Sequence, residues 1–346
     1  MTIRFPRPLA PGDLIALPAP SAGVPELLHP RLDRAIAALR KQGYRVVEGD
    51  CLRQGATSAR ATREARASEL MAFLVDPDVA AIMPPWGGDL AIELLPLLDF
   101  HHLKQVSPKW FSGFSDLSTL QLPLATIAGW ASLHGPNLMQ LGSSTLDATT
   151  AAIWGVLSLP PDTPFLQSAS LRHPNQQAAS PTGSADIWAE TQWRPLDGTR
   201  ADISLTGRLI GGCLDTLSRL AGTVFGAVPR YIEASRPAGT LLYLENAEMK
   251  PYDLARALLS LRMAGWFDGL SGVLLGRSGV SEPAQRDEFA YIDALQTALG
   301  DLPCPVIHDM DIGHIPPQMS LVNGAFAQVE LRRGRGTVVQ WLKNSH

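Results

Sequence analysis

The segment "PKWFSGFSDLSTL" (108–120) decides the fold, because it is typical of a short buried strand that turns sharply into a helix. The strand is expected from Trp110 to Phe114 and the helix from about Asp116, which leaves Ser115 at the turn. Strands that alternate with helices build an α/β fold. A serine on such a turn projects its hydroxyl clear of the sheet, next to the N–H groups at the helix start.

The same alternation continues through the first 160 residues. Three further apolar runs, "DLIALPAP" (13–20), "YRVVEG" (44–49) and "VAAIMPPWGG" (79–88), are separated by segments with helical spacing of apolar residues. This rhythm predicts an N-terminal α/β domain over 1–160, with a parallel sheet of the flavodoxin or Rossmann type. In such sheets, functional groups gather on the loops beyond the carboxyl ends of the strands.

The composition changes after residue 160. Residues 161–190 are rich in Pro, Ser, Gln and Ala and are predicted to form a linker or irregular loop. Residues 191–346 contain short strand-like runs interrupted by two helical segments, and they end in an apparent hairpin that turns at "GRG" (334–336). They are predicted to form a mixed, largely antiparallel, β-rich C-terminal domain.

Composition also excludes several classes of protein. The chain has 346 residues, 18% of them charged, a net charge of −4 and no run of Lys or Arg, so nucleic acid is not an expected partner. No apolar run approaches the roughly 20 residues of a membrane helix, and the first residues do not resemble a signal peptide. Cys51, Cys213 and Cys304 are far apart, which argues against a cysteine metal cluster and favours a reducing, cytoplasmic location.

Ser115 has two interpretations that its own segment leaves open. It could be a nucleophile, since "GFS" is the first half of the G-x-S-x-G turn of hydrolases, although Leu117 replaces the second glycine. It could equally be a plain helix N-cap, with Ser118 at the third helical position, N3. Ser112 is expected within the strand.

A nucleophilic serine needs a base and an acid that orients the base. His314 follows Gly313 in a loop with no evident structural need for an imidazole, whereas His134 and His308 are weaker candidates. Glu245 ends the apolar run "TLLYLE" (240–245), where a carboxylate is costly without a partner. It could be the orienting acid or part of a structural ion pair.

Two other kinds of site compete with a hydrolase. His308, Asp309, Asp311 and His314 fall within seven residues and could bind a divalent metal, although the spacing matches no helical zinc motif, so we favour a site without metal. Alternatively, the "GGD" turn and the helix start at Asp116 could hold an anionic ligand without catalysis.

Five motifs occur in an order that resembles the LD-carboxypeptidases, a family of serine peptidases. The resemblance spans nearly the whole chain. The family includes members that act on muropeptide tetrapeptides and members that confer immunity to microcin C. The motifs are "GFSD" (113–116), "GGCLD" (211–215), "LYLENAEMKPYDLARAL" (242–258), "GVLLGR" (272–277) and "DIGH" (311–314).

The resemblance implies a catalytic triad of Ser115, Glu245 and His314, with the triad residues drawn from both domains. It also implies that Gly87, Gly88 and the backbone N–H of Asp116 hold the oxyanion. The implied reaction is hydrolysis of an L–D peptide bond that releases D-Ala from a muropeptide tetrapeptide through an acyl-enzyme, in peptidoglycan recycling, without metal or organic cofactor. A homodimer is also expected.

Two departures from the family pattern leave the substrate open. The family's Arg-Gly-Gly-Tyr-Gly turn is replaced here by "PPWGGDL" (84–90), and its Gly-Gly-Asn-Leu by "GGCL" (211–214). Both changes are closer to the microcin-immunity members, for which the resemblance implies cleavage of a peptidyl-nucleotide or related amide, or to another, uncharacterised branch of the family. Trp86 could line a pocket and stack on a planar group, as could Trp188 and Trp193, but tryptophans more often anchor a core.

Overall fold

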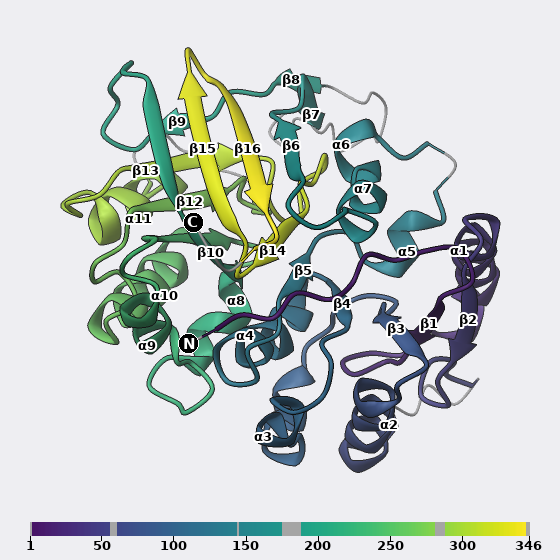
Figure 1. Cartoon of the computed structure of the whole chain (residues 1–346). Coiled ribbons are helices and arrows are strands. Elements are labelled where there is room, and N and C mark those ends of the chain that lie inside the picture. Colours follow the sequence, from purple (N-terminus) through teal and green to yellow (C-terminus); the bar gives the residue numbers. More distant parts are fainter. Residues whose placement is uncertain (1, 56–60, 144, 175–187, 281–287, 344–346) are drawn as a thin grey trace.

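The chain folds around two large β-sheets that lie in neighbouring halves of the molecule and share one hydrophobic core (Figure 1). The computed structural model describes residues 2–55, 61–143, 145–174, 188–280 and 288–343. None of the helices in these ranges is both long and apolar enough to cross a membrane.

The first sheet has six strands in the order β14-β5-β4-β3-β1-β2. All neighbours pair in parallel except β14 and β5, so β1 to β5 follow the doubly wound order 2-1-3-4-5 of flavodoxin-like folds. This confirms the predicted parallel α/β unit. The strands are β1 (Leu14–Leu17), β2 (Arg45–Glu48), β3 (Val79–Ile82), β4 (Trp110–Gly113), β5 (Ser132–His134) and β14 (Leu321–Asn323).

The helices of this half form where the sequence has helical spacing. In α1, Leu32, Ala35, Ile36 and Leu39 are all buried, which is one face of a 3.6-residue helix. The side chain of Thr62 caps α2 by accepting the N–H of Ala65. The helical segments are η1 (Glu26–Leu28), α1 (His29–Lys41), α2 (Arg63–Val75), η2 (Ala91–Leu97), α3 (Phe100–Leu103), η3 (Ser115–Leu117), α4 (Ser118–Thr126), α5 (Leu138–Leu141), α6 (Ala148–Ala151) and α7 (Ile153–Leu157).

The second sheet has eight strands in the order β6-β16-β15-β10-β11-β12-β13-β9. Its central pairings, from β10 to β13, are parallel, and the outer ones are antiparallel, so the sheet is mixed as predicted. Its strands are β6 (Pro164–Ser168), β9 (Arg194–Pro195), β10 (Ile203–Cys213), β11 (Thr240–Glu245), β12 (Gly272–Gly276), β13 (Val306–Met310), β15 (Phe326–Arg332) and β16 (Arg335–Trp341).

The remaining helical segments belong to this second half. The longest, α10, buries Leu254, Leu258 and Leu261 at helical spacing. These segments are α8 (Leu214–Leu217), η5 (Ser218–Leu220), α9 (Val228–Ala234), α10 (Pro251–Met263) and α11 (Tyr291–Leu299).

The predicted linker over 161–190 contains regular structure, which differs from the expectation of an irregular loop. β6 pairs with β16 at the edge of the second sheet, and β7 (Arg172–Pro174) pairs with β8 (Trp188–Glu190). Only Gln167 of β6 is buried. Because an edge strand of this kind lacks an apolar alternation, its sequence gives little signal. Residues 175–187 of the predicted linker lie outside the described residues.

The two halves are joined through their interior. β14 comes from the C-terminal half of the chain and completes the first sheet. All nine residues of α4 are buried, and this helix contacts both β5 and β10. One hydrophobic cluster includes Ile15 and Leu133 of the first sheet with Ile210 and Leu242 of the second. The carboxyl ends of β4, β10 and β11 therefore meet in a fixed arrangement.

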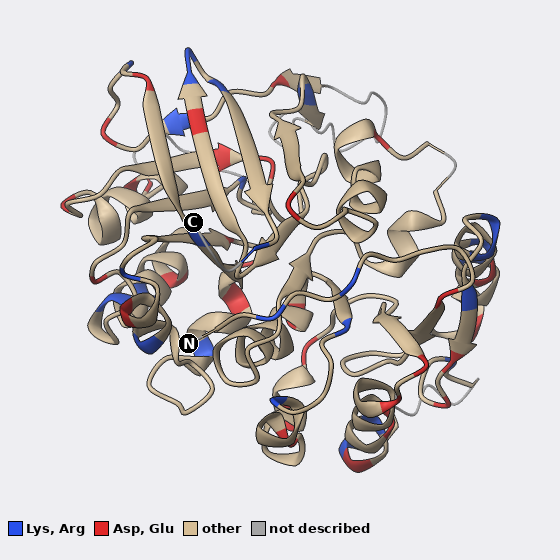
Figure 2. Ribbon diagram, in the orientation of Figure 1, with Lys and Arg blue, Asp and Glu red and all other residues tan. Residues whose placement is uncertain are grey.

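Basic and acidic side chains are interspersed on the helices of both halves (Figure 2). On α1, α2 and α10, residues of both signs lie on the same helix, including the exposed pair Arg256 and Asp253. Charges of both signs are therefore mixed along these three helices.

Candidate active site

Ser115 lies on a sharp turn between β4 and η3. Its φ angle is +66°, in the left-handed region that costs a residue other than glycine about 1 kcal/mol or more. The residue at the N-cap position is Phe114, and the hydroxyl of Ser115 lies 3.1 Å from Nε2 of His314. The turn therefore aims this hydroxyl at an imidazole, which favours the nucleophile interpretation over the cap.

The other two serines of the opening segment face elsewhere. Ser112 is buried in β4, and its hydroxyl has no hydrogen-bond partner among the described residues. Ser118 is fully buried, and its Oγ accepts the backbone N–H of Cys213 at 3.0 Å. Ser118 thus joins α4 to the end of β10, which is a structural role.

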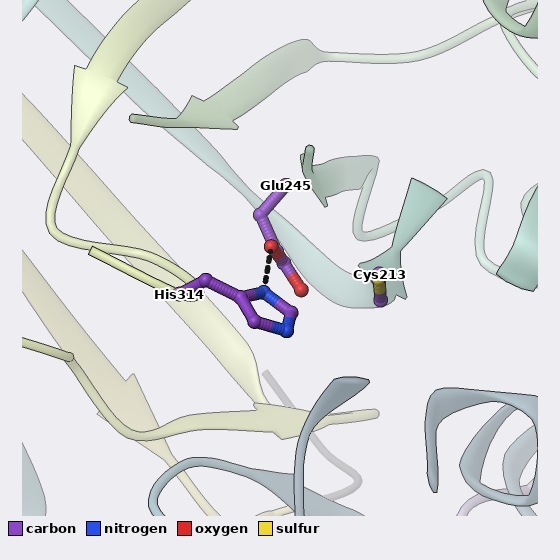
Figure 3. A group of neighbouring side chains, drawn as sticks. All are labelled: Cys213, Glu245 and His314. Carbon is purple, nitrogen blue, oxygen red and sulfur yellow. Dashed lines mark hydrogen bonds and ion pairs between the residues drawn. The ribbon is translucent and has the colours of Figure 1, made fainter. Parts of the chain in front are cut away.

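Glu245 and His314 form a hydrogen-bonded pair (Figure 3), and the Ser115 hydroxyl lies beside the His314 ring. Glu245 is the last residue of β11 and only 1% exposed, and its Oε2 lies 2.8 Å from Nδ1 of His314. A carboxylate can only accept, so Nδ1 carries the proton and Nε2 is free to accept the hydrogen of the Ser115 hydroxyl. A side chain at Gly313 would overlap the Glu245 carboxylate, so glycine is required there.

Glu245 and His314 each stabilise the charged form of the other. Burial disfavours the imidazolium form of His314, but the charge and hydrogen bond of Glu245 outweigh burial and hold the pKa of His314 above its usual range. Burial would likewise raise the pKa of Glu245, but the His314 contact lowers it overall. The acid therefore stays ionised while the imidazole gains basicity, as a general base requires.

His134 is a second imidazole behind the pair, on β5. It is completely buried, and burial lowers its pKa to about 4, so it is neutral at pH 7. Its Nε2 lies 4.0 Å from Oε1 of Glu245, and its ring packs edge-on against Phe114 and Tyr243. Neither ring nitrogen has a hydrogen-bond partner among the described residues.

The turn at Gly87 and Gly88 lies directly against Ser115. A methyl group at Gly87 would be 2.8 Å from the Asp116 nitrogen and 3.0 Å from the Ser115 hydroxyl oxygen. The Asp116 carboxylate is buried and accepts the Ala91 N–H at 2.7 Å, and it also accepts the hydroxyl of Ser21. Burial raises the pKa of Asp116 despite these bonds. Asp116 thus fixes the loops that follow β1 and β3 around the serine.

A cavity of about 640 Å³ opens over these residues between the two halves. Gly88 and Ser115 border it from the first half, and Cys213, Asp215 and His314 border it from the second. No Trp, Tyr or Phe is among the residues that line it in the described part of the chain. The lining is polar, and both acidic and basic side chains contribute to it.

The three tryptophans considered from the sequence lie away from this cavity lining. The Trp86 indole donates to the carbonyl of Ala22 at 3.0 Å and packs against the core. Trp193 is buried and donates to Asp311, whereas Trp188 lies half-exposed on β8.

The alternative metal group of His308, Asp309, Asp311 and His314 is not gathered in one place. Asp311 is fully buried and pairs with Arg277 at 2.9 Å, while His314 faces Glu245. His308 instead lies 3.2 Å from the Asp309 carboxylate. Among the described residues, the group that could hold a metal is Cys213, Glu245 and His314. The sequence did not predict that Cys213 lies beside Glu245, although its position directly after Gly211 and Gly212 at the end of an apolar run was a usable signal.

Comparison with known proteins agrees with the resemblance seen in the motifs. Residues 15–135 match the model of the LD-carboxypeptidase N-terminal domain, and residues 206–329 match that of the LD-carboxypeptidase C-terminal domain. A putative carboxypeptidase of Streptomyces coelicolor is 31% identical over 336 residues, which cover 96% of this chain and 95% of the relative.

Two named relatives represent the two kinds of member. A murein tetrapeptide carboxypeptidase of Pseudomonas aeruginosa is 29% identical over 79% of this chain and 80% of the relative. The microcin C7 self-immunity protein MccF of Escherichia coli is 24% identical over 92% of this chain and 90% of the relative. A solved wild-type apo structure of MccF superposes with a TM-score of 0.81 at 21% identity, covering 98% of this chain and 99% of that one. The chain therefore belongs to the LD-carboxypeptidase family of serine-type peptidases.

Proposed function

We propose that this chain removes the C-terminal residue of a small peptide by means of a triad of Ser115, His314 and Glu245. The observation that carries the proposal is the continuous hydrogen-bonded chain from the Ser115 hydroxyl through His314 to Glu245. The three residues come from different parts of the sequence and meet at one cavity. This arrangement is the recurring solution for activating a serine.

The chemistry follows from the positions of the protons. His314 takes the hydroxyl proton at Nε2 as Ser115 Oγ attacks the scissile carbonyl, and Glu245 stabilises the imidazolium that forms. The imidazolium then gives this proton to the leaving amine, and the C–N bond breaks to leave an acyl-serine. Water, deprotonated by His314, attacks the ester; Ser115 recovers its proton and the acid product leaves.

The negative charge that develops on the carbonyl oxygen needs donors close to Ser115. We assign this role to the backbone N–H of Asp116 and to the Gly87–Gly88 turn. A side-chain carbon at Gly87 would lie 2.8 Å from the Asp116 nitrogen, so the glycine leaves open the space in which an oxyanion could accept that N–H. A donor in such a position typically lowers the barrier by roughly 3 kcal/mol. Trp86 has no part in this assignment, since its indole is bonded to Ala22.

The substrate that the cavity favours is a muropeptide tetrapeptide, from which the enzyme would release D-Ala by cleaving an L–D bond. A cavity with mixed charges and a polar lining suits a peptide with charged ends. Stacking on a nucleobase, as a peptidyl-nucleotide would require, has no aromatic partner among its described lining residues. A cytoplasmic location and a homodimer stay predictions.

The test is release of free D-Ala from a purified muropeptide tetrapeptide. Wild type should release it, and Ser115→Ala should lose nearly all of this activity. Ser158→Ala is the matched control, because Ser158 lies exposed at the end of α7 and bonds only to the Trp154 carbonyl.

The other outcomes separate the alternatives. Full release by Ser115→Ala would contradict the assigned nucleophile. A folded wild type that releases no D-Ala but hydrolyses an aminoacyl sulfamoyl nucleoside would replace the muropeptide by the detoxification substrate class. Binding of an anionic peptide without any hydrolysis would support the non-catalytic binding alternative.

A further inference from the structure

Cys213 places a thiol beside the Glu245–His314 pair (Figure 3). Its Sγ, one carboxylate oxygen of Glu245 and one ring nitrogen of His314 all lie within 4.8 Å of one another. We propose that these three side chains form a binding site for a soft divalent cation such as Zn²⁺ or Cd²⁺, and that a bound ion switches hydrolysis off. The inhibition, but not the binding, rests on the proposed function.

The backbone holds two of the three ligands in register. Cys213 and Glu245 are the last residues of β10 and β11, and they are paired neighbours in this parallel ladder. Side chains at paired positions leave a sheet on the same face. A tetrahedral zinc ion with bonds of about 2.0–2.3 Å holds its ligand atoms roughly 3.3–3.8 Å apart. The three side chains therefore need to close by only about 1 Å, which small rotations supply.

The available atoms suit a cation. Oε1 of Glu245 is buried and meets no partner at ordinary hydrogen-bond geometry in the described part of the chain, and the neighbouring Cys213 thiol interacts with this carboxylate. Thiolate and imidazole are the ligands that zinc and cadmium prefer. Oδ2 of Asp215 lies 3.7 Å from the Cys213 sulfur and adds a further negative charge at the site. With the thiolate formed, two anionic ligands and a neutral imidazole would face a dication.

The ion has a route to the site, and its effect on catalysis follows from the ligands it uses. Cys213 and His314 both border the cavity, so an ion can arrive through it with water as its fourth ligand. Binding releases the thiol proton to solvent. Because the thiol must lose its proton to bind the ion, affinity should increase with pH. An ion held by His314 and Glu245 takes the general base away from Ser115.

Binding can be measured without any assay of activity. Titration of the full chain with Cd²⁺ should give one bound ion per chain and the ultraviolet absorption of a cadmium thiolate. Cys213→Ser should abolish this absorption and weaken binding about 100-fold or more, since it removes a direct ligand. Cys51→Ser is the matched control, because Cys51 lies away from the cavity lining. Ser115→Ala should bind as wild type does, because it keeps all three ligands.

The outcomes distinguish the site from the inhibition. A wild type with no thiolate absorption, or an absorption that survives in Cys213→Ser, would overturn the site; Cys213→Asn provides a second variant if the serine protein does not fold. Hydrolysis of the muropeptide should be inhibited by Zn²⁺ and restored by a chelator. Full turnover by the ion-saturated enzyme would overturn the inhibition. A chain that binds Cd²⁺ but hydrolyses nothing would overturn only the proposed function and would support the site.

Discussion

At the scale of single residues, His314 links a surface-accessible serine to a buried carboxylate. In the proposed mechanism its neutral form is the base, and the pKa of His314 lies above its usual value because of Glu245. The rate constant kcat/KM should therefore fall as the pH drops through this raised pKa, since the imidazolium cannot accept a proton. A pH profile of kcat/KM measures this acid limb directly.

Replacement of Glu245 tests whether this carboxylate causes the raised pKa of His314 and hence the acid limb of the pH profile. Glu245→Gln removes the charge that stabilises the imidazolium, so the acid limb should move to lower pH, while the plateau falls by about 10³-fold or more. Glu233→Gln is a matched control, because Glu233 is exposed and pairs only with Arg236. An unchanged acid limb in Glu245→Gln would contradict the assigned partner of His314.

A second prediction for a single residue concerns kcat after substitution of Gly87. In Gly87→Ala the new methyl group would lie 2.8 Å from the Asp116 nitrogen and fill the space assigned to the oxyanion. We expect kcat to fall by about 10²-fold or more, the usual effect of losing one oxyanion donor. Gly55→Ala is the control, because the space around Gly55 is open. Near-normal kcat in a folded Gly87→Ala protein would rule out this oxyanion site.

Some of these residues could be identified from the sequence and others could not. Ser115, Glu245 and His314 were singled out because each lies at the end of a strand or after a glycine, family resemblance sharpened the choice of Glu245, and the structure brings the three together. Trp86 was considered for a pocket because its position next to Gly87 was clear, but its side-chain direction was not. It turns away to bond the carbonyl of Ala22.

At the scale of secondary-structure elements, β5 carries a buried imidazole against the end of β11. The pKa of His134 is about 4, against about 6.5 in an unfolded chain, so the neutral form is favoured by folding. The stability from this residue is complete above pH 6.5 and is lost as the pH falls towards 4, by about 3 kcal/mol in all. His134→Gln should therefore make the free energy of unfolding less dependent on pH between 4 and 6.5.

Urea unfolding at several pH values checks this prediction for β5. His134→Gln and wild type share every other titrating group, so the difference between their pH slopes reports on His134 and on its charge coupling to Glu245 and His314. Equal slopes for the two proteins would mean that the imidazole is not held neutral in the fold.

The elements that were predicted well have strong patterns of their own. The spacing of Leu32, Ile36 and Leu39 indicates a helix, and the terminal hairpin β15–β16 turns near "GRG" as expected. β6 was missed because it is an edge strand whose pairing partner, β16, lies about 170 residues later in the chain. Which strand pairs with which is a long-range property that a local pattern does not contain.

At the scale of the whole molecule, the two halves share one interior. β14 completes the first sheet from the C-terminal half, and α4 lies buried against strands of both sheets. Unfolding in urea should therefore occur in a single transition, with far-ultraviolet circular dichroism and tryptophan fluorescence changing together. The buried Trp110 and Trp130 report on the first half, and Trp193 and Trp266 on the second. Two separate transitions would mean that the halves fold independently.

The shared interior also brings Ser115 and His314, which come from different halves, within hydrogen-bond distance, as the proposed triad requires. The measurement that tests this account most directly is the mass of the chain after treatment with a serine-directed fluorophosphonate, with the modified residue identified by fragmentation. We predict one adduct per chain, on Ser115, which is absent in Ser115→Ala and forms at least about 10³-fold more slowly in His314→Gln. An adduct on another serine, or equal labelling of the His314→Gln protein, would contradict the triad.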